Sequence, residues 1–214
     1  MTDAETRQKF GRALSLSITW FRLALAPIIV IIAAAGGDGR IIAAAILVES
    51  VGDVYDGKIA RRFGVATARL RRFDSRVDTI FYVGVAIALW LAHRQILIDH
   101  ALLFGAFMLF QIAGMVVDLR KFGRDTSYHT WTGRALGLTL FIATTYIFAT
   151  GSAGPWLDIA LIAGIISNID ALVITAILPE WRHDVHTVFQ ALQIRRSLLS
   201  DPEWVSAHGP TNPR

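Results

Sequence analysis

The chain has 214 residues, 54% of them hydrophobic, and its mean hydropathy is +0.49. This composition is typical of a polytopic membrane protein and argues against a soluble globular core. The sequence has no cysteine, which excludes disulfides and thiolate chemistry, and its formal charge of +4 is modest. We therefore expect an all-α membrane protein whose function depends on where its charges lie.

Residues 1–14 are polar with scattered apolar side chains, a pattern that predicts a short helix lying on the membrane surface. The apolar run at 18–35 has two interpretations, a cleaved signal peptide or a first spanning helix. The run is longer than the apolar part of a signal peptide, and it contains Arg22. We favour a retained spanning helix.

Six segments are apolar and near the length that crosses a bilayer. They lie at about 18–35, 41–62, 73–92, 101–117, 136–150 and 156–178, and glycines at 36, 37 and 39 predict a tight turn after the first. Residues 15–178 are thus expected to form one membrane domain. Residues 179–214 are expected to form a cytoplasmic juxtamembrane helix and a loose tail.

Six spans place both termini on one side of the membrane. That side would carry the basic residues of the N-terminus, of 62–72 and of 120–134, together with Arg182, whereas the other side would carry only Arg40 and Arg94. The positive-inside rule therefore predicts that both termini are cytoplasmic.

One face of the second predicted helix is chemically unusual. Four residues follow Asp53 at distances of three, four, seven and eight positions: Asp56, Gly57, Ala60 and Arg61. On a helix with 3.6 residues per turn, all five lie in one stripe along the same face. The two small residues leave room for a ligand against the helix, and the arginine offers a planar fork for a phosphate.

Asp74 and Asp78 share a face of the next helix in the same way. If the two helices run antiparallel, all four carboxylates can converge at one depth. Carboxylate oxygens suit hard divalent cations such as Mg²⁺. Glu49 lies one turn before Asp53, where it supports the metal site or, as we favour, pairs with a neighbouring helix.

The stretch from Asp53 to Asp78 resembles the signature of the CDP-alcohol phosphatidyltransferase family. That signature reads D-x2-D-G-x2-A-R, eight residues, and then G-x3-D-x3-D. Seven of its eight positions match, and Leu70 stands in place of the second glycine. The resemblance in membrane layout covers roughly residues 15–178.

The resemblance implies roles for several residues. Gly57, Ala60 and Arg61 would seat the cytidine diphosphate, and Thr19 and Arg22, in a T-x2-R-x4-P pattern, would lie near the nucleotide. An arginine that snorkels to the membrane surface is an equal interpretation of Arg22. Arg134, in a Gly-Arg pair, would contact a phosphate of the acceptor, although a charge that sets topology explains it at least as well.

The implied activity is transfer of a phosphatidyl-type group from a CDP-linked lipid such as CDP-diacylglycerol to a small acceptor alcohol, with release of CMP. Mg²⁺ or Mn²⁺, as two ions, would be held by the aspartates at 53, 56, 74 and 78, and Asp78 would act as the base. The resemblance also suggests a bacterial inner-membrane protein, a possible homodimer, membrane lipids as partners and no nucleic acid. Two alternatives stay open: a non-catalytic family member that binds lipid or nucleotide, and a transporter.

Overall fold

The computed structural model describes residues 3–65, 67–124, 126, 128, 130–182, 184–202 and 204. Within these ranges the chain forms seven α-helices and no strand, so the predicted all-α class is confirmed. The side chains of Arg69, Arg71 and Arg72 in the predicted basic turn, and most of the predicted tail after residue 200, lie outside the described part.

The chain divides into two compact units. The first takes residues up to 99 together with 141–154, and the second takes residues 100–140 together with those from 155 onward. The helix α5 (Trp131–Thr150) contributes its first half to the second unit and its second half to the first.

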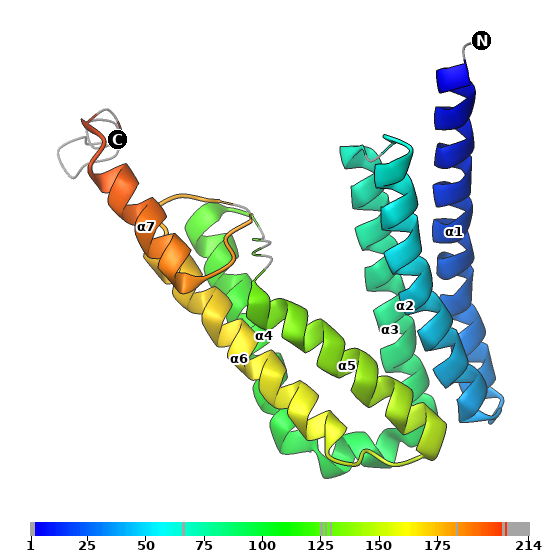
Figure 1. Ribbon diagram of the computed structural model, residues 1–214. Coiled ribbons are helices and arrows are strands. Elements are labelled where there is room, and N and C mark those ends of the chain that lie inside the picture. The colour runs from blue at the N-terminus through cyan, green and yellow to red at the C-terminus, as the bar shows by residue number, and fades with distance from the viewer. Residues whose placement is uncertain are drawn as a thin grey trace. The chain divides into compact units, whose positions relative to one another are not determined.

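Three long helices build the first unit: α1 (Asp3–Ala34), α2 (Gly39–Arg62) and α3 (Ala68–Asp99). Figure 1 shows them side by side, and α1 packs against both α2 and α3. At Gly84 of α3 a Cβ would lie 3.2 Å from the backbone oxygen of Ala26, so the absence of a side chain there lets α1 and α3 approach closely. This packing places the faces of α2 and α3 that carry the acids beside α1.

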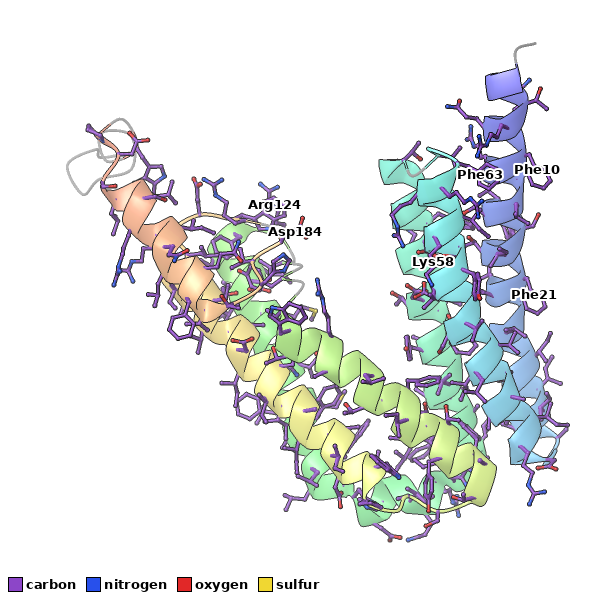
Figure 2. All side chains as sticks on the ribbon, in the orientation of Figure 1. Phe10, Phe21, Lys58, Phe63, Arg124 and Asp184 are labelled. Atoms are coloured by element: carbon purple, nitrogen blue, oxygen red, sulfur yellow. The ribbon has the colours of Figure 1, made fainter. Side chains whose placement is uncertain are left out.

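The predicted short helix at 1–14 is not a separate element, because α1 runs unbroken from Asp3. The reason lies at Phe63, which follows α2. A Cβ at Gly11 would lie 2.3 Å from the Phe63 Cβ, and the Phe10 ring meets the Phe63 ring edge-on at 6.1 Å (Figure 2). These contacts hold the first turns of α1 against the end of α2.

Capping hydrogen bonds mark the residues at which α2 and α3 begin. Asp38 caps α2 by accepting a hydrogen bond from the Arg40 backbone nitrogen at 2.9 Å. Gly36 adopts a positive φ of 67°, as the predicted turn requires. Thr67 accepts from the Leu70 backbone nitrogen at 3.2 Å, so α3 begins at residue 68, earlier than the predicted 73. It also continues past the predicted 92, through a kink at His93.

The second unit contains α4 (Ala101–Phe122), α6 (Trp156–Ile177) and α7 (Val188–Leu199). In Figure 1, α4 and α7 both lie along α6, in agreement with their contacts. Lys121 donates from Nζ to the carbonyl oxygens of Thr175, at 2.6 Å, and Ala176, at 3.1 Å, and so satisfies the end of α6. The helix α7 lies within residues 179–214, where a juxtamembrane helix was expected, and its place beside the membrane stays a prediction.

A polar network closes the same end of this unit. Asp118 accepts hydrogen bonds from Thr126 and, at 2.7 Å, from Thr175, whose hydroxyl also lies 3.0 Å from the Tyr128 hydroxyl. Burial raises the pKa of the Tyr128 phenol, which therefore stays neutral. The polar side chains of this network form hydrogen bonds with one another, and we assign the network a structural role.

Five described helical segments are long and apolar enough to cross a membrane: 6–34, 76–99, 101–122, 131–150 and 156–177. These segments indicate a membrane protein. The predicted count of six spans is not confirmed, because α2 is not among them. The charged residues of α2, which include Asp53 and Asp56, lower the hydropathy of this helix.

Candidate functional site

The aspartates of α2 and α3 converge, as the spacing predicted. One carboxylate oxygen each from Asp53, Asp56 and Asp74 lie within 4.8 Å of one another. Two of these residues come from α2 and one from α3, so the cluster depends on the packing of both helices against α1. Three oxygens this close form a donor set that fits a hard divalent cation.

Arg22 of α1 lies at the centre of this cluster, with its side chain fully buried. Its Nη1 donates to Asp56 Oδ2 at 2.6 Å and to Asp74 Oδ1 at 2.7 Å. Its Nη2 lies 2.9 Å from Glu49 Oε1 and 3.0 Å from Asp53 Oδ1, and it also donates to Asp78. One guanidinium therefore contacts all four signature aspartates and Glu49.

This arrangement bears on two alternatives that the sequence left open. The Arg22 guanidinium does not extend outward as a snorkelling arginine would, because it lies within the three-helix packing and contacts five acids. Glu49 pairs with a neighbouring helix through Arg22, and because the same arginine contacts the aspartates, a supporting role for Glu49 at the site stays a prediction. Thr19, one turn before Arg22, is also buried, and its hydroxyl donates to the Ser15 carbonyl at 3.0 Å and lies 3.5 Å from Asp56 Oδ2.

Gly52 of α2 makes room for the arginine stem. A Cβ at this position would lie 3.1 Å from the Arg22 Cδ and 3.3 Å from its Cγ, tighter than ordinary contacts. The aliphatic part of Arg22 therefore passes against the bare backbone of α2 before its guanidinium reaches the acids.

The cluster has a buried floor and an accessible rim. The side chains of Glu49 and Asp56 are each 4% exposed, whereas those of Asp53, Asp74 and Asp78 are 46%, 30% and 36% exposed. Counted as fully ionised, the five carboxylates against one guanidinium would carry a formal charge of −4. Such an excess of negative charge is costly away from water and favours a further cation at the rim.

The rest of the α2 stripe lies one to two turns further along the helix. Ala60 is buried, Gly57 is half-buried and Arg61 is exposed. The Arg61 guanidinium folds back along the helix, with Nη1 3.4 Å from where a Gly57 Cβ would stand. The expected small surface and basic group are therefore adjacent, and their role toward a nucleotide stays a prediction.

Arg134 belongs to the second unit, in the first turns of α5, where its guanidinium stacks over the Trp131 ring at 4.6 Å. Its expected contact with an acceptor phosphate stays a prediction. What sequence reasoning missed is the central position of Arg22. The signal that could have found it is an arginine inside an apolar helix, with a threonine one turn before and a glycine on the facing helix.

An all-helical fold with several membrane-length apolar helices and a convergent set of acids defines a membrane protein with a candidate divalent-cation site. A family model described as CDP-alcohol phosphatidyltransferase matches residues 13–177, and the chain belongs to this family. The family is a class of phosphotransferases with a CDP-alcohol donor and an alcohol acceptor. No curated protein and no solved structure matches the chain.

Proposed function

We propose that this protein transfers a phosphatidyl-type group from a CDP-linked lipid, such as CDP-diacylglycerol, to an acceptor alcohol and releases CMP. The observation that carries the proposal is the convergence of Asp53, Asp56 and Asp74 within 4.8 Å, at positions of the family's own signature. In the reaction, the acceptor oxygen forms a bond to the lipid-linked phosphorus while the bond from that phosphorus to CMP breaks.

Asp53, Asp56, Asp74 and Asp78 would hold Mg²⁺ or Mn²⁺, for which their oxygens are suitable ligands. When bound, such ions neutralise the diphosphate and stabilise negative charge on the phosphoryl oxygens. Arg22 supplies a positive charge at the centre of the same cluster and holds the carboxylates of both helices together.

Asp78 is the proposed base that removes the proton of the acceptor hydroxyl. Arg22 donates to its Oδ1 and so orients the carboxylate. With 36% of the side chain exposed, Asp78 is accessible to an acceptor that enters from the rim. Asp78 takes up the proton of the acceptor hydroxyl, and the new bond from the acceptor oxygen to phosphorus replaces the broken bond to CMP, which departs as the leaving group.

Gly57, Ala60 and Arg61 are the proposed seat of the cytidine diphosphate. Arg61 is exposed and carries no acid partner among the described residues, so its charge is available to a phosphate. Thr19 and Arg22 face the acids, and we assign them to the support of the aspartates. Their direct contact with the nucleotide remains an expectation from the family.

For the acceptor we propose a phosphorylated polyol, such as glycerol 3-phosphate or an inositol phosphate, with Arg134 as a phosphate contact. The proposed setting is a bacterial inner membrane with both termini in the cytoplasm, where soluble acceptors are available. Homodimer formation is proposed from the family alone.

The test is CMP release by purified protein in nanodiscs with CDP-diacylglycerol and Mn²⁺, across glycerol 3-phosphate, inositol phosphate, inositol and serine. We expect release with one phosphorylated acceptor and none after chelation. Asp99→Asn provides a matched control, because Asp99 lies on α3 outside the cluster and accepts a bond from Gln95. Nucleotide binding without release for any acceptor would favour the non-catalytic alternative.

A further inference from the structure

A cavity of about 620 Å³ lies in the first unit, between α1 and the segment from residue 65 to the start of α3. Pockets of this size enclose small organic ligands. Its lining divides into two chemical kinds, a basic pair and an apolar wall, and none of the roles proposed above uses it.

The basic pair is Arg12 of α1 and Arg76 of α3, both exposed side chains. No described carboxylate lines the cavity or forms an ion pair with either arginine. Arg22, by contrast, is surrounded by acids. Two uncompensated guanidinium groups at one cavity favour an anion, and the guanidinium fork matches a phosphate.

The cavity borders the acidic cluster at Leu70, which lies one turn before Asp74 on the same face of α3. Its basic pair lies apart from the cluster, although Arg76 stands between Asp74 and Asp78 in the sequence. Residues two apart on a helix do not share a face. Arg76 therefore points to another side of α3 than the two aspartates, which contact Arg22. An anion held by Arg76 avoids the repulsion that it would meet beside the aspartates.

The wall is apolar and partly aromatic. Trp20, itself 58% exposed, packs against Phe73 with ring centroids 5.3 Å apart, and Leu16 and Leu70 extend the wall. Leu70 is the residue that departs from the family signature, and here it adds apolar surface to the cavity. Tryptophan together with arginine is typical of the membrane–water interface.

We propose that this cavity binds an anionic glycerophospholipid from the bilayer. Its headgroup phosphate lies at Arg12 and Arg76, and the upper part of an acyl chain lies against Leu16, Trp20 and Phe73. A soluble phosphate compound would use the arginines but gain nothing from the apolar wall, which favours the lipid. Basic pockets between membrane helices bind anionic headgroups in this way. The inference stands on the cavity alone and does not depend on the transferase activity.

Trp20 provides the probe. In phosphatidylcholine nanodiscs, a small fraction of brominated phosphatidylglycerol or of brominated phosphatidylcholine is added, and quenching of fluorescence is measured. The Trp20→Phe variant gives the signal of the five other tryptophans, which is subtracted. We expect Trp20 to be quenched several-fold more by the anionic brominated lipid than by the neutral one at equal content.

The arginines are tested by the double change Arg12→Gln and Arg76→Gln, which should make the two brominated lipids equivalent. Arg62→Gln is the matched control, because Arg62 is an exposed arginine at the end of α2 that does not line the cavity. If the double variant does not fold, competition replaces it: unlabelled phosphatidylglycerol should relieve the quenching and unlabelled phosphatidylcholine should not.

Equal quenching of Trp20 by both brominated lipids in the unaltered protein would overturn the proposal. Relief of the quenching by free glycerol 3-phosphate as effective as relief by phosphatidylglycerol would also overturn it, since it would identify a soluble phosphate as the ligand. CMP release is measured separately, so failure here leaves the proposed transferase activity standing, and loss of that activity leaves this result unchanged.

Discussion

Arg22 of α1 and Asp56 of α2 form a buried ion pair, with 2.6 Å between Nη1 and Oδ2. Both side chains are almost completely removed from solvent, and the same guanidinium also binds the acids of α3. Arg22 therefore connects all three helices of the first unit at the site of the proposed chemistry. Its loss should affect stability and cation binding together.

Replacing Arg22 by methionine should lower the free energy of unfolding by about 3–5 kcal/mol, because it leaves buried carboxylates without their internal cation. Unfolding in detergent micelles, followed by circular dichroism, measures the change. Saturating Mn²⁺ should restore part of the loss, since a metal ion can compensate the same charges. Arg94→Met controls for the loss of an exposed arginine. If Arg22→Met were as stable as Arg94→Met, the role assigned to Arg22 would be contradicted.

Gly52→Ala should destabilise the protein by about 1–3 kcal/mol, because the new methyl group crowds the Arg22 stem. Combined with Arg22→Met, the two losses should be less than additive, since the crowded side chain has changed. Gly105→Ala is the matched control: it is also a helical glycine, and a Cβ there meets nothing within 4 Å. Additive losses would show that Gly52 does not act through Arg22.

Asp74→Asn should weaken Mn²⁺ binding by about tenfold or more, because it removes one charged ligand from the cluster and leaves its shape unchanged. Electron paramagnetic resonance of free Mn²⁺ during a titration gives the dissociation constant without any need for turnover. Asp99→Asn, on the same helix, should bind Mn²⁺ like the unaltered protein. Identical binding by the two variants would remove Asp74 from the metal site.

Asp78→Asn should reduce CMP release by about 10²–10⁴-fold, the usual contribution of a general base. Binding of the CDP-linked lipid should be retained within a few-fold, because the proposed nucleotide seat on α2 is untouched. Single-turnover assays together with equilibrium binding separate the two effects. Normal turnover by Asp78→Asn would show that another group accepts the proton.

The aspartate cluster could be predicted from the sequence because helical spacing fixes which residues of one helix share a face. This rule was enough to pair Asp53 with Asp56 and Asp74 with Asp78, and the resemblance to the family added the expected roles of these residues. The role of Arg22 could not be derived in this way. It depends on how α1 packs against two other helices, and helical spacing within α1 carries no information on that.

Among the described residues, the short helix expected at 1–14 is not a separate element and the expected count of six spans is not confirmed, each for a physical reason. The first turns of α1 were expected to lie apart on the membrane surface, but Gly11 lets them pack on Phe63. The count of six spans treated α2 like its neighbours, although its charges, from Glu49 to Arg62, set it apart from the five apolar candidates. In the first case a contact between two helices mattered more than local periodicity. In the second case the charges along one helix did.

We propose that the acidic cluster supports acceptor-dependent transfer with a bound divalent cation. The most direct test is CMP release from CDP-diacylglycerol with Mn²⁺, comparing the unaltered protein, Asp74→Asn and Asp99→Asn at saturating acceptor. The account predicts release by the unaltered protein and by Asp99→Asn, its loss after chelation and recovery on Mn²⁺ addition, and little release by Asp74→Asn. Release that survives both chelation and the Asp74→Asn change would contradict it.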